Sequence, residues 1–112
     1  MSERVVVQPA GNPIRVTSGG SPVAESHTAH VVHETGLPPR YYFPKEHLKA
    51  QVEPGTGEGV CPWKGKWRHL DVIVGDQRIA NGAWTYYETT PVCAVIKDAV
   101  AFYPEKVSIE IG

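Results

Sequence analysis

Long apolar runs and a surplus of positive charge are both missing from this chain of 112 residues. No segment approaches the roughly 20 consecutive apolar residues that a bilayer core requires, so the sequence predicts no membrane span. Lysine and arginine together number 11 against 12 acidic residues, for a net charge of -1 at pH 7. Because a protein that mainly grips nucleic-acid backbone needs excess cations, we expect neither nucleic acid nor a membrane as a partner.

Leucine and methionine are scarce, with 4 residues between them, whereas valine and isoleucine number 21. Branching at Cβ restricts side-chain rotation and suits pleated strands better than helices. Glycine and proline number 11 and 10 and are spread along the whole chain, so the strands must be short. The composition therefore predicts one mainly β domain that spans residues 1–112.

Cysteine is rare as well, with only Cys61 and Cys93, and neither lies in a CxxC motif. A structural zinc site therefore has no support in the sequence. The first residues are not followed by the apolar segment of a secretory signal, so we expect a cytoplasmic protein, whose thiols stay reduced. No feature indicates a cofactor, and the sequence does not fix the oligomeric state.

Apolar residues alternate with polar ones in short segments bounded by glycine and proline, which is typical of strands. The pattern predicts strands at residues 5–7, 14–17, 22–25, 30–34, 40–43, 49–52, 66–74, 78–81, 84–87, 99–103 and 107–111. We expect the first of these to pair in order as a β-meander, with a single helical turn at Pro44–Leu48 and a loop at the glycine-rich residues 53–59. Thr90–Asp98 is predicted as the one clear helix, with Thr90 as its N-cap and Pro91 in its first turn.

The most unusual segment is Cys61–His69, which holds two tryptophans, three lysine or arginine residues and one thiol but no acidic residue. The glycine-rich residues before it are suited to bring backbone N–H groups together on an anion, with Lys64 or Arg68 supplying positive charge. An unbroken strand would place the tryptophans and His69 on one face and the cations on the other, unless a bulge at Gly65 changes the phase. The alternative is that the tryptophans are core residues and the cations form a solvated sheet edge.

Aromatic residues also cluster in Arg40–Glu46 and in Trp84–Glu88. Tyrosine and tryptophan combine an apolar ring with one hydrogen-bonding atom, so they line ligand pockets as readily as they fill cores. Both uses remain open for Tyr42, Trp84 and Tyr86.

Two further groups of residues invite a chemical interpretation. His27, His30 and His33 have three-residue spacing, but on a strand the outer two would lie about 20 Å apart with His30 on the opposite face, so we predict no metal site. Cys61 lies near three cations that would stabilise a thiolate, and His69 or another histidine would serve as a base if it were close. A buried, unreactive thiol is the alternative.

Four short blocks of the sequence resemble, in the same order, the signature blocks of the bacterial and fungal family called domain of unknown function 427. These blocks are Tyr42–Glu46, Cys61–Gly65, Asn81–Tyr86 and Ala101–Val107. The chain departs from the family pattern at Trp63, where tyrosine is more usual, and at Thr85–Tyr87, where Ser-Tyr-Pro is more usual. Both departures keep an aromatic surface.

The resemblance implies a mainly β fold, a compact β-complex of several short coiled antiparallel sheets with one short helix near residues 91–98. This architecture is similar to that of the methionine-R-sulfoxide reductases, although the zinc-binding CxxC pairs of those enzymes are absent here. The family also carries a nucleotidyltransferase-like label. We set that label aside, because the sequence shows no paired carboxylates of the kind that hold Mg²⁺.

The family blocks coincide with the aromatic and cationic residues that stand out in the chain. Our leading hypothesis is a ligand-binding domain of a bacterial protein, with a pocket for a small anionic or sugar-like molecule. We expect this pocket to be formed by Tyr42, Lys45, Cys61, Trp63, Lys64, Trp84 and Tyr86.

Two alternatives to a binding pocket remain open. One is an enzyme with Cys61 as nucleophile or redox thiol and Lys64 as the group that stabilises an anion. The other is a protein interaction module that adds a partner strand to a sheet edge. The pocket hypothesis depends on one spatial expectation, that Lys64 and Trp84 face the same hollow.

Overall fold

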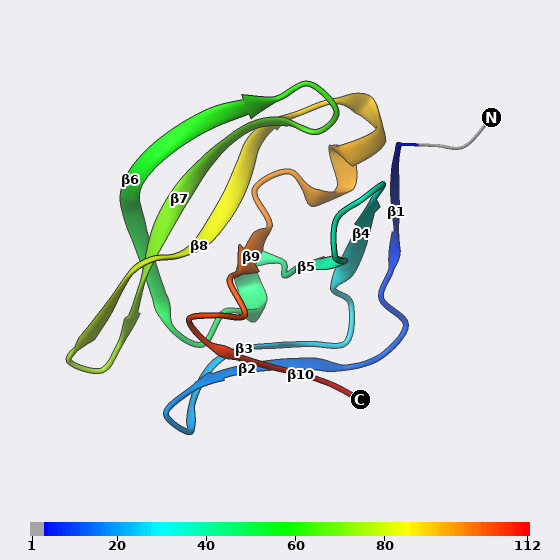
Figure 1. The fold of residues 1–112 in the computed structure, drawn as a ribbon. Coiled ribbons are helices and arrows are strands. Elements are labelled where there is room, and N and C mark those ends of the chain that lie inside the picture. The colour runs from blue at the N-terminus through cyan, green and yellow to red at the C-terminus, as the bar shows by residue number, and fades with distance from the viewer. Residues whose placement is uncertain (1–3) are drawn as a thin grey trace.

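Three antiparallel sheets make up most of residues 4–112, the part of the chain that the computed structural model describes (Figure 1). The strands are β1 (Val5–Pro9), β2 (Ile14–Ser18), β3 (Ser21–Ser26), β4 (His30–Glu34), β5 (Arg40–Tyr42), β6 (Gln51–Cys61), β7 (Gly65–Val74), β8 (Gln77–Thr89), β9 (Val100–Phe102) and β10 (Ser108–Ile111). Two 3₁₀ helices, η1 (Lys45–His47) and η2 (Pro91–Ile96), complete the described elements. The mainly β class predicted from branched residues and frequent turns is confirmed.

The strand order differs from a simple meander. The sheets run β1-β4-β5, β10-β2-β3 and β6-β7-β8-β9, so β1 pairs with β4 and not with β2. The meander prediction is therefore wrong at its first step. The segment after β1 turns away, and the N–H of Ala10 donates to the carbonyl of Ala29, which carries β1 alongside β4.

The first and third sheets are joined through Phe43 and Val100, whose backbones exchange hydrogen bonds of 2.8 and 2.9 Å. This bridge places β5 beside β9, so the two sheets meet at an edge. Figure 1 shows β6, β7 and β8 as long curved strands on one side of the molecule, with β4 and β5 facing them. The space between these strands is where the aromatic residues gather.

The glycine-rich residues 53–59, predicted as a loop, form part of β6 instead. Their backbone pairs with β7 over most of its length, with a register shift between Pro54 and Glu58. A proline and several glycines are tolerated here because β6 is an edge strand, where one row of backbone groups needs no partner in the sheet. The two strands predicted at 78–81 and 84–87 likewise form one strand, β8, and Gly82 between them is buried, where a Cβ would lie 2.9 Å from Cγ2 of Ile79.

The helix predicted at Thr90–Asp98 is present only as the six-residue 3₁₀ helix η2. Thr90 occupies the N-cap position as predicted, but its side chain makes no capping hydrogen bond, because its hydroxyl donates to the carbonyl of Trp63 at 3.0 Å. The single turn predicted at Pro44–Leu48 is confirmed as η1. Neither helical segment within residues 4–112 has the length and apolar character needed to cross a membrane.

Buried apolar side chains form two clusters. One lies among the strands of the second and third sheets and centres on residues such as Val16, Val72 and Phe102. The other joins β1, β4 and β5 to β8 and η2, and it contains Tyr42, Trp84, Tyr86, Cys93 and Ile96. Four members of the second cluster, Val32, Tyr42, Trp84 and Tyr86, also line the candidate site described below.

Candidate functional site

A hollow of about 200 Å³ opens where β4 and β5 face β7 and β8. Its walls are five aromatic rings, three charged side chains and three aliphatic ones. The lining residues are Val32, Glu34, Leu37, Pro38, Arg40, Tyr42, Lys64, Trp67, Trp84, Tyr86 and Tyr103. The central expectation from the sequence therefore holds in its geometry, since Lys64 and Trp84 line the same hollow.

Strand periodicity explains why the rings converge. Trp84 and Tyr86 are two residues apart on β8, so their side chains leave the same face of the sheet. Trp67 on β7 is the cross-strand partner of Tyr86. Tyr103, just beyond β9, is held by a 3.0 Å hydrogen bond from its N–H to the carbonyl of Gly82. Tyr42 arrives from β5 on the opposite side.

Trp84 is the centre of the aromatic group. Its ring centroid lies 4.4 Å from that of Tyr103 and 6.1 Å from that of Tyr42, which it meets edge-on. Its indole N–H donates to the hydroxyl of Tyr42 at 3.0 Å. Because that donor is already used, Trp84 offers the hollow an apolar ring surface and not a hydrogen bond.

Lys64 does not carry a free charge at this site. Its Nζ lies 2.5 Å from Oε1 of Glu34, and the two side chains are 12% and 7% exposed. Arg4 approaches the other carboxylate oxygen at 3.8 Å. Within residues 4–112 the buried Oε1 accepts no hydrogen bond with normal angles, so the contact with Lys64 is an ion pair without hydrogen-bond geometry. The positive charge is compensated inside the protein.

Arg40 is the cation that remains available. Its guanidinium carbon lies 5.5 Å from the ring centre of Trp84, over the wall of the hollow. No carboxylate of residues 4–112 lies within 4.0 Å of this guanidinium. A planar, permanently charged group stacked on an indole is well suited to hold a carboxylate in two hydrogen bonds.

The tyrosines around the hollow stay protonated at neutral pH. Burial raises the pKa of Tyr42 well above its usual range, more than the hydrogen bond from Trp84 lowers it. Burial likewise raises the pKa of Tyr86 and of Tyr103. Each phenol therefore keeps one O–H to donate, and the direction in which it points depends on its neighbours.

The structure brings four of the seven predicted pocket residues to the hollow, namely Tyr42, Lys64, Trp84 and Tyr86. Cys61 is half-buried and packs against the aromatic cluster without lining the hollow. Trp63 is 48% exposed in the turn after β6, with the Arg4 guanidinium 5.0 Å from its ring centre. Lys45 is exposed on η1 and lines separate depressions.

Unbroken alternation over residues 63–69 does not hold at its beginning, and the change of phase that the sequence allowed at Gly65 is present. Lys64 lines the hollow together with Trp67, whereas the strand pattern placed them on opposite faces. The reason is that β7 begins only at Gly65, whose φ of +132° breaks the extended backbone, and that the pairing with β8 shifts between Lys66 and Trp67. Beyond that point the alternation is regular, and Arg68 stacks on Tyr87 on the other face at 4.3 Å.

Four charged or aromatic lining residues were not predicted, and they are Glu34, Arg40, Trp67 and Tyr103. Arg40 and Tyr103 lie within or beside the aromatic segments that the sequence singled out, so their proximity was a usable signal. Nothing local marks Glu34, because its role depends on Lys64, which lies 30 positions later in the chain.

The side chains of residues 4–112 provide no cluster of metal ligands. Within residues 4–112 no three histidine, cysteine, aspartate or glutamate side chains are grouped to hold an ion. His30 and His33 lie on β4, and the ring of His33 is 3.3 Å from the side-chain amide nitrogen of Gln8. Both thiols are free, and burial raises the pKa of Cys93.

Comparison with known proteins gives a family but no activity. The family model described as Domain of unknown function (DUF427), which carries the label NTP_transf_9, matches residues 6–112. No curated protein matches the chain. The match covers all of β1 except Val5, and every element from β2 to β10, and it includes all residues that line the hollow.

Proposed function

The chain belongs to the family described as domain of unknown function 427, and from that premise we propose that it is a binding domain for a small organic anion with one ring-sized apolar group. The observation that carries this proposal is Arg40, the one cation lining the hollow that has no carboxylate within 4.0 Å among residues 4–112, placed over a wall of aromatic rings. The sequence analysis expected Lys64 to bind the anionic group of the ligand, and the proposal assigns this role to Arg40 instead. Lys64 lines the same hollow, but its charge is paired with Glu34.

The size of the hollow limits the ligand. Its volume of about 200 Å³ is below the roughly 300–1,000 Å³ that hold drug-sized molecules. One aromatic or saturated ring with a carboxylate or a similar anionic group fits this space. A nucleoside triphosphate is too large and carries several more charges than one arginine can neutralise, so we do not propose nucleotidyl transfer.

The aromatic walls favour a ligand with a flat apolar part. Trp84 and Tyr103 stand with centroids 4.4 Å apart at an angle of 43°, and Trp67 closes the same side. Offset and tilted stacking on such rings stabilises an aromatic guest by about 0.5–1.5 kcal/mol beyond area burial. A sugar ring would use the same surface, so monosaccharides belong in the test.

The sheet edges are less suited to be the main binding surface. The long edge strand β6 contains Pro54, which has no N–H to donate, and a register shift at the same place. Such features are common devices against strand addition. We place the protein in the cytoplasm as part of the same proposal, because two unpaired thiols suit a reducing compartment.

Tryptophan fluorescence and calorimetry with phenylacetate test the proposal, and phenylacetamide and glucose serve as neutral probes. We expect saturable binding of the carboxylate that is at least about tenfold tighter than that of its amide. Arg40→Gln should remove this preference. The matched control is Arg15→Gln on β2, where the arginine pairs with Glu25 on the surface and should leave binding unchanged.

Two results would overturn the proposal. One is the absence of saturable binding by phenylacetate and by related ring carboxylates such as benzoate. The other is an equal preference for carboxylate over amide in the wild-type protein and in Arg40→Gln. Preferential binding of glucose would favour a sugar site on the same rings in place of the anion site.

A further inference from the structure

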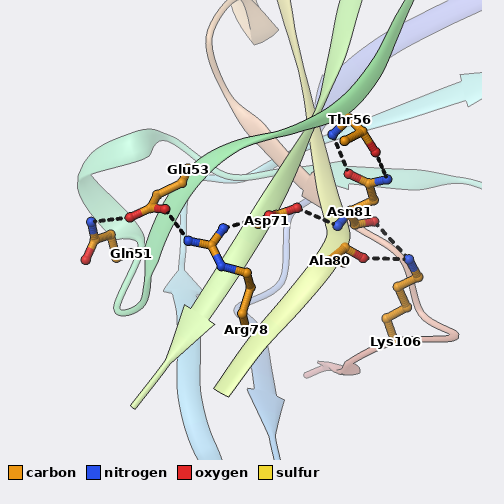
Figure 2. Close-up of polar contacts among 8 residues, drawn as sticks. All are labelled: Gln51, Glu53, Thr56, Asp71, Arg78, Ala80, Asn81 and Lys106. Carbon is orange, nitrogen blue, oxygen red and sulfur yellow. Dashed lines mark hydrogen bonds and ion pairs between the residues drawn. The ribbon is translucent and has the colours of Figure 1, made fainter. Parts of the chain in front are cut away.

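Behind the wall of the hollow, a chain of hydrogen bonds fixes the position of Thr56 on the bulged part of β6. The Thr56 N–H donates to Oδ1 of Asn81, and the Asn81 side-chain amide donates to the Thr56 hydroxyl, both at 2.9 Å. The Asn81 N–H in turn donates to Oδ1 of Asp71 at 2.8 Å. Figure 2 shows this network, with Asn81 between Asp71 and Thr56. The bulge is therefore held by side chains of β7 and β8 and is not a loose turn.

The bulge directs the carbonyl of Thr56 at a histidine. Nδ1 of His69 lies 2.9 Å from the Thr56 carbonyl oxygen, and Nε2 lies 2.9 Å from the hydroxyl oxygen of Tyr103. The imidazole also packs against Trp67, with ring centres 4.9 Å apart. His69 does not line the hollow, but both of the aromatic residues that it touches do.

These contacts determine which nitrogen of His69 carries the hydrogen. A carbonyl oxygen can only accept, so Nδ1 must be the donor to Thr56. In a neutral imidazole the other nitrogen then has no hydrogen and must accept. The hydroxyl of Tyr103 is therefore the donor to His69, and its single hydrogen is not available to a ligand. What Tyr103 can still offer in the hollow is an acceptor lone pair.

We propose that His69 is a positioning residue that sets ligand specificity, because it fixes the Tyr103 hydroxyl as an acceptor toward the hollow. The preferred ligand then carries a hydrogen-bond donor beside its anionic group. Arg40 and Tyr103 both line the hollow, and the Arg40 guanidinium carbon and the Tyr103 ring centre lie 5.5 and 4.4 Å from the Trp84 ring centre, so we place the anion and the donor on one small ligand. A 2-hydroxy or 2-amino carboxylic acid with one ring meets these requirements. This inference rests on the proposed function.

Three probes of nearly equal size test it at pH 8. Mandelate carries a hydroxyl donor beside the carboxylate, phenylglyoxylate carries a carbonyl acceptor there, and phenylacetate carries neither. We expect the wild-type protein to bind mandelate about three- to tenfold more tightly than phenylacetate, and phenylglyoxylate least tightly, because two acceptors would face each other.

His69→Phe keeps a ring at this position but frees the Tyr103 hydrogen. In this variant the preference for mandelate over phenylglyoxylate should disappear, while the affinity for phenylacetate stays within about threefold of the wild-type value. His69→Gln, which keeps an acceptor in reach of Tyr103, should restore part of the preference. Tyr103→Phe provides a second test that does not depend on the folding of the histidine variants, because loss of the hydroxyl should remove discrimination between the hydroxy and keto acids.

The outcomes separate this inference from the proposed function. Binding of phenylacetate without any preference for mandelate leaves the anion pocket in place and overturns the role of His69. An equal loss of affinity for all three acids in His69→Phe has the same meaning, because a merely structural histidine would produce it. Failure of all three acids to bind the wild-type protein overturns the proposed function itself.

Discussion

The ammonium of Lys64 lies 2.5 Å from Oε1 of Glu34, and both groups are largely withdrawn from water. The contact joins the end of β4 to the turn between β6 and β7, two segments that belong to different sheets. Both side chains line the aromatic hollow, and Arg4 approaches the second carboxylate oxygen of Glu34 at 3.8 Å. The geometry of the candidate site therefore depends on a pair whose loss would leave one buried charge without its close partner.

Removing either partner of this pair should be costly. We expect Lys64→Met to lower the free energy of unfolding by about 3–5 kcal/mol, because the buried Glu34 carboxylate would keep only its longer 3.8 Å contact with the half-exposed Arg4. Urea denaturation of the wild-type protein and the variant measures the difference. The double variant Lys64→Met with Glu34→Leu should recover most of the loss, because two apolar side chains of similar size replace both charges.

The exposed pair of Lys66 and Glu88 is the matched control. Its side chains are 50% and 63% exposed, so Lys66→Met should change stability by no more than about 1 kcal/mol. If Lys64→Met lowered the free energy of unfolding no more than Lys66→Met does, the buried pair would add no more stability than the exposed one. A double variant as unstable as the sum of its two single variants would contradict the pairing as well.

Asp71 should give the fold an acid-sensitive component. The N–H of Asn81 and the guanidinium of Arg78 both hydrogen-bond its carboxylate, and in that order they hold its pKa below the usual 3.8. The folded state therefore favours the charged form. The stability that this adds is fully present above pH 3.8 and is lost as the pH falls below that value through the folded-state pKa.

Asp71→Asn tests this directly by urea denaturation at several pH values. The variant should be less stable than the wild-type protein at neutral pH, and the difference should shrink as the pH is lowered below about 4. Asp76→Asn, in the exposed turn after β7, serves as the control and should follow the wild-type curve. A difference between Asp71→Asn and the wild-type protein that stays constant over the whole range would refute the linkage.

Gly65 should not tolerate a side chain. Its φ is +132°, and a Cβ would overlap the carbonyl oxygen of Glu88 and approach Cα of Thr89 to 2.8 Å. Because both obstacles are backbone atoms of β8, Gly65→Ala should destabilise the protein by about 3 kcal/mol or more. Gly75→Ala is the control for positive φ alone, since its Cβ meets nothing within 4 Å and the cost should be about 1 kcal/mol. Equal melting temperatures for the two variants would disprove this account.

Local patterns predicted the strands but not their partners. Alternation located β4 and β7 closely, because the side chains that alternate there are neighbours in the chain. The pairing of β1 with β4 instead of β2 depends on backbone hydrogen bonds between segments more than 20 residues apart, which no short window contains. The glycine-rich part of β6 was taken for a loop for the same reason, since β7 supplies its backbone partners.

In the candidate site, too, local sequence patterns indicated some residues but not their distant partners. Tyr42, Trp84 and Tyr86 were found because aromatic residues stand out in composition and leave a strand in a regular direction. Lys64 was placed correctly at the hollow, but its partner Glu34 was not foreseen, so its charge was assigned to a ligand. Trp63 was predicted as a wall and is exposed, because the turn before Gly65 changes the direction in which its side chain leaves the chain.

The two thiols should differ in reactivity, which bears on the alternative that the protein is a thiol enzyme. Cys93 is fully buried on η2 and burial raises its pKa, whereas Cys61 at the end of β6 is partly exposed. The buried thiol of Cys93 can react only when the structure around it opens. Cys93 should therefore react with a disulfide reagent at least about a hundredfold more slowly than Cys61 in the native protein. Cys61→Ser should abolish the fast reaction and keep the slow one, and in concentrated guanidinium chloride both thiols of the wild-type protein should react at once. If Cys93 reacted in the native protein as fast as Cys61, the cluster that supports Tyr42 and Tyr86 would be open to solvent, and the rigid wall on which the anion pocket depends would not exist.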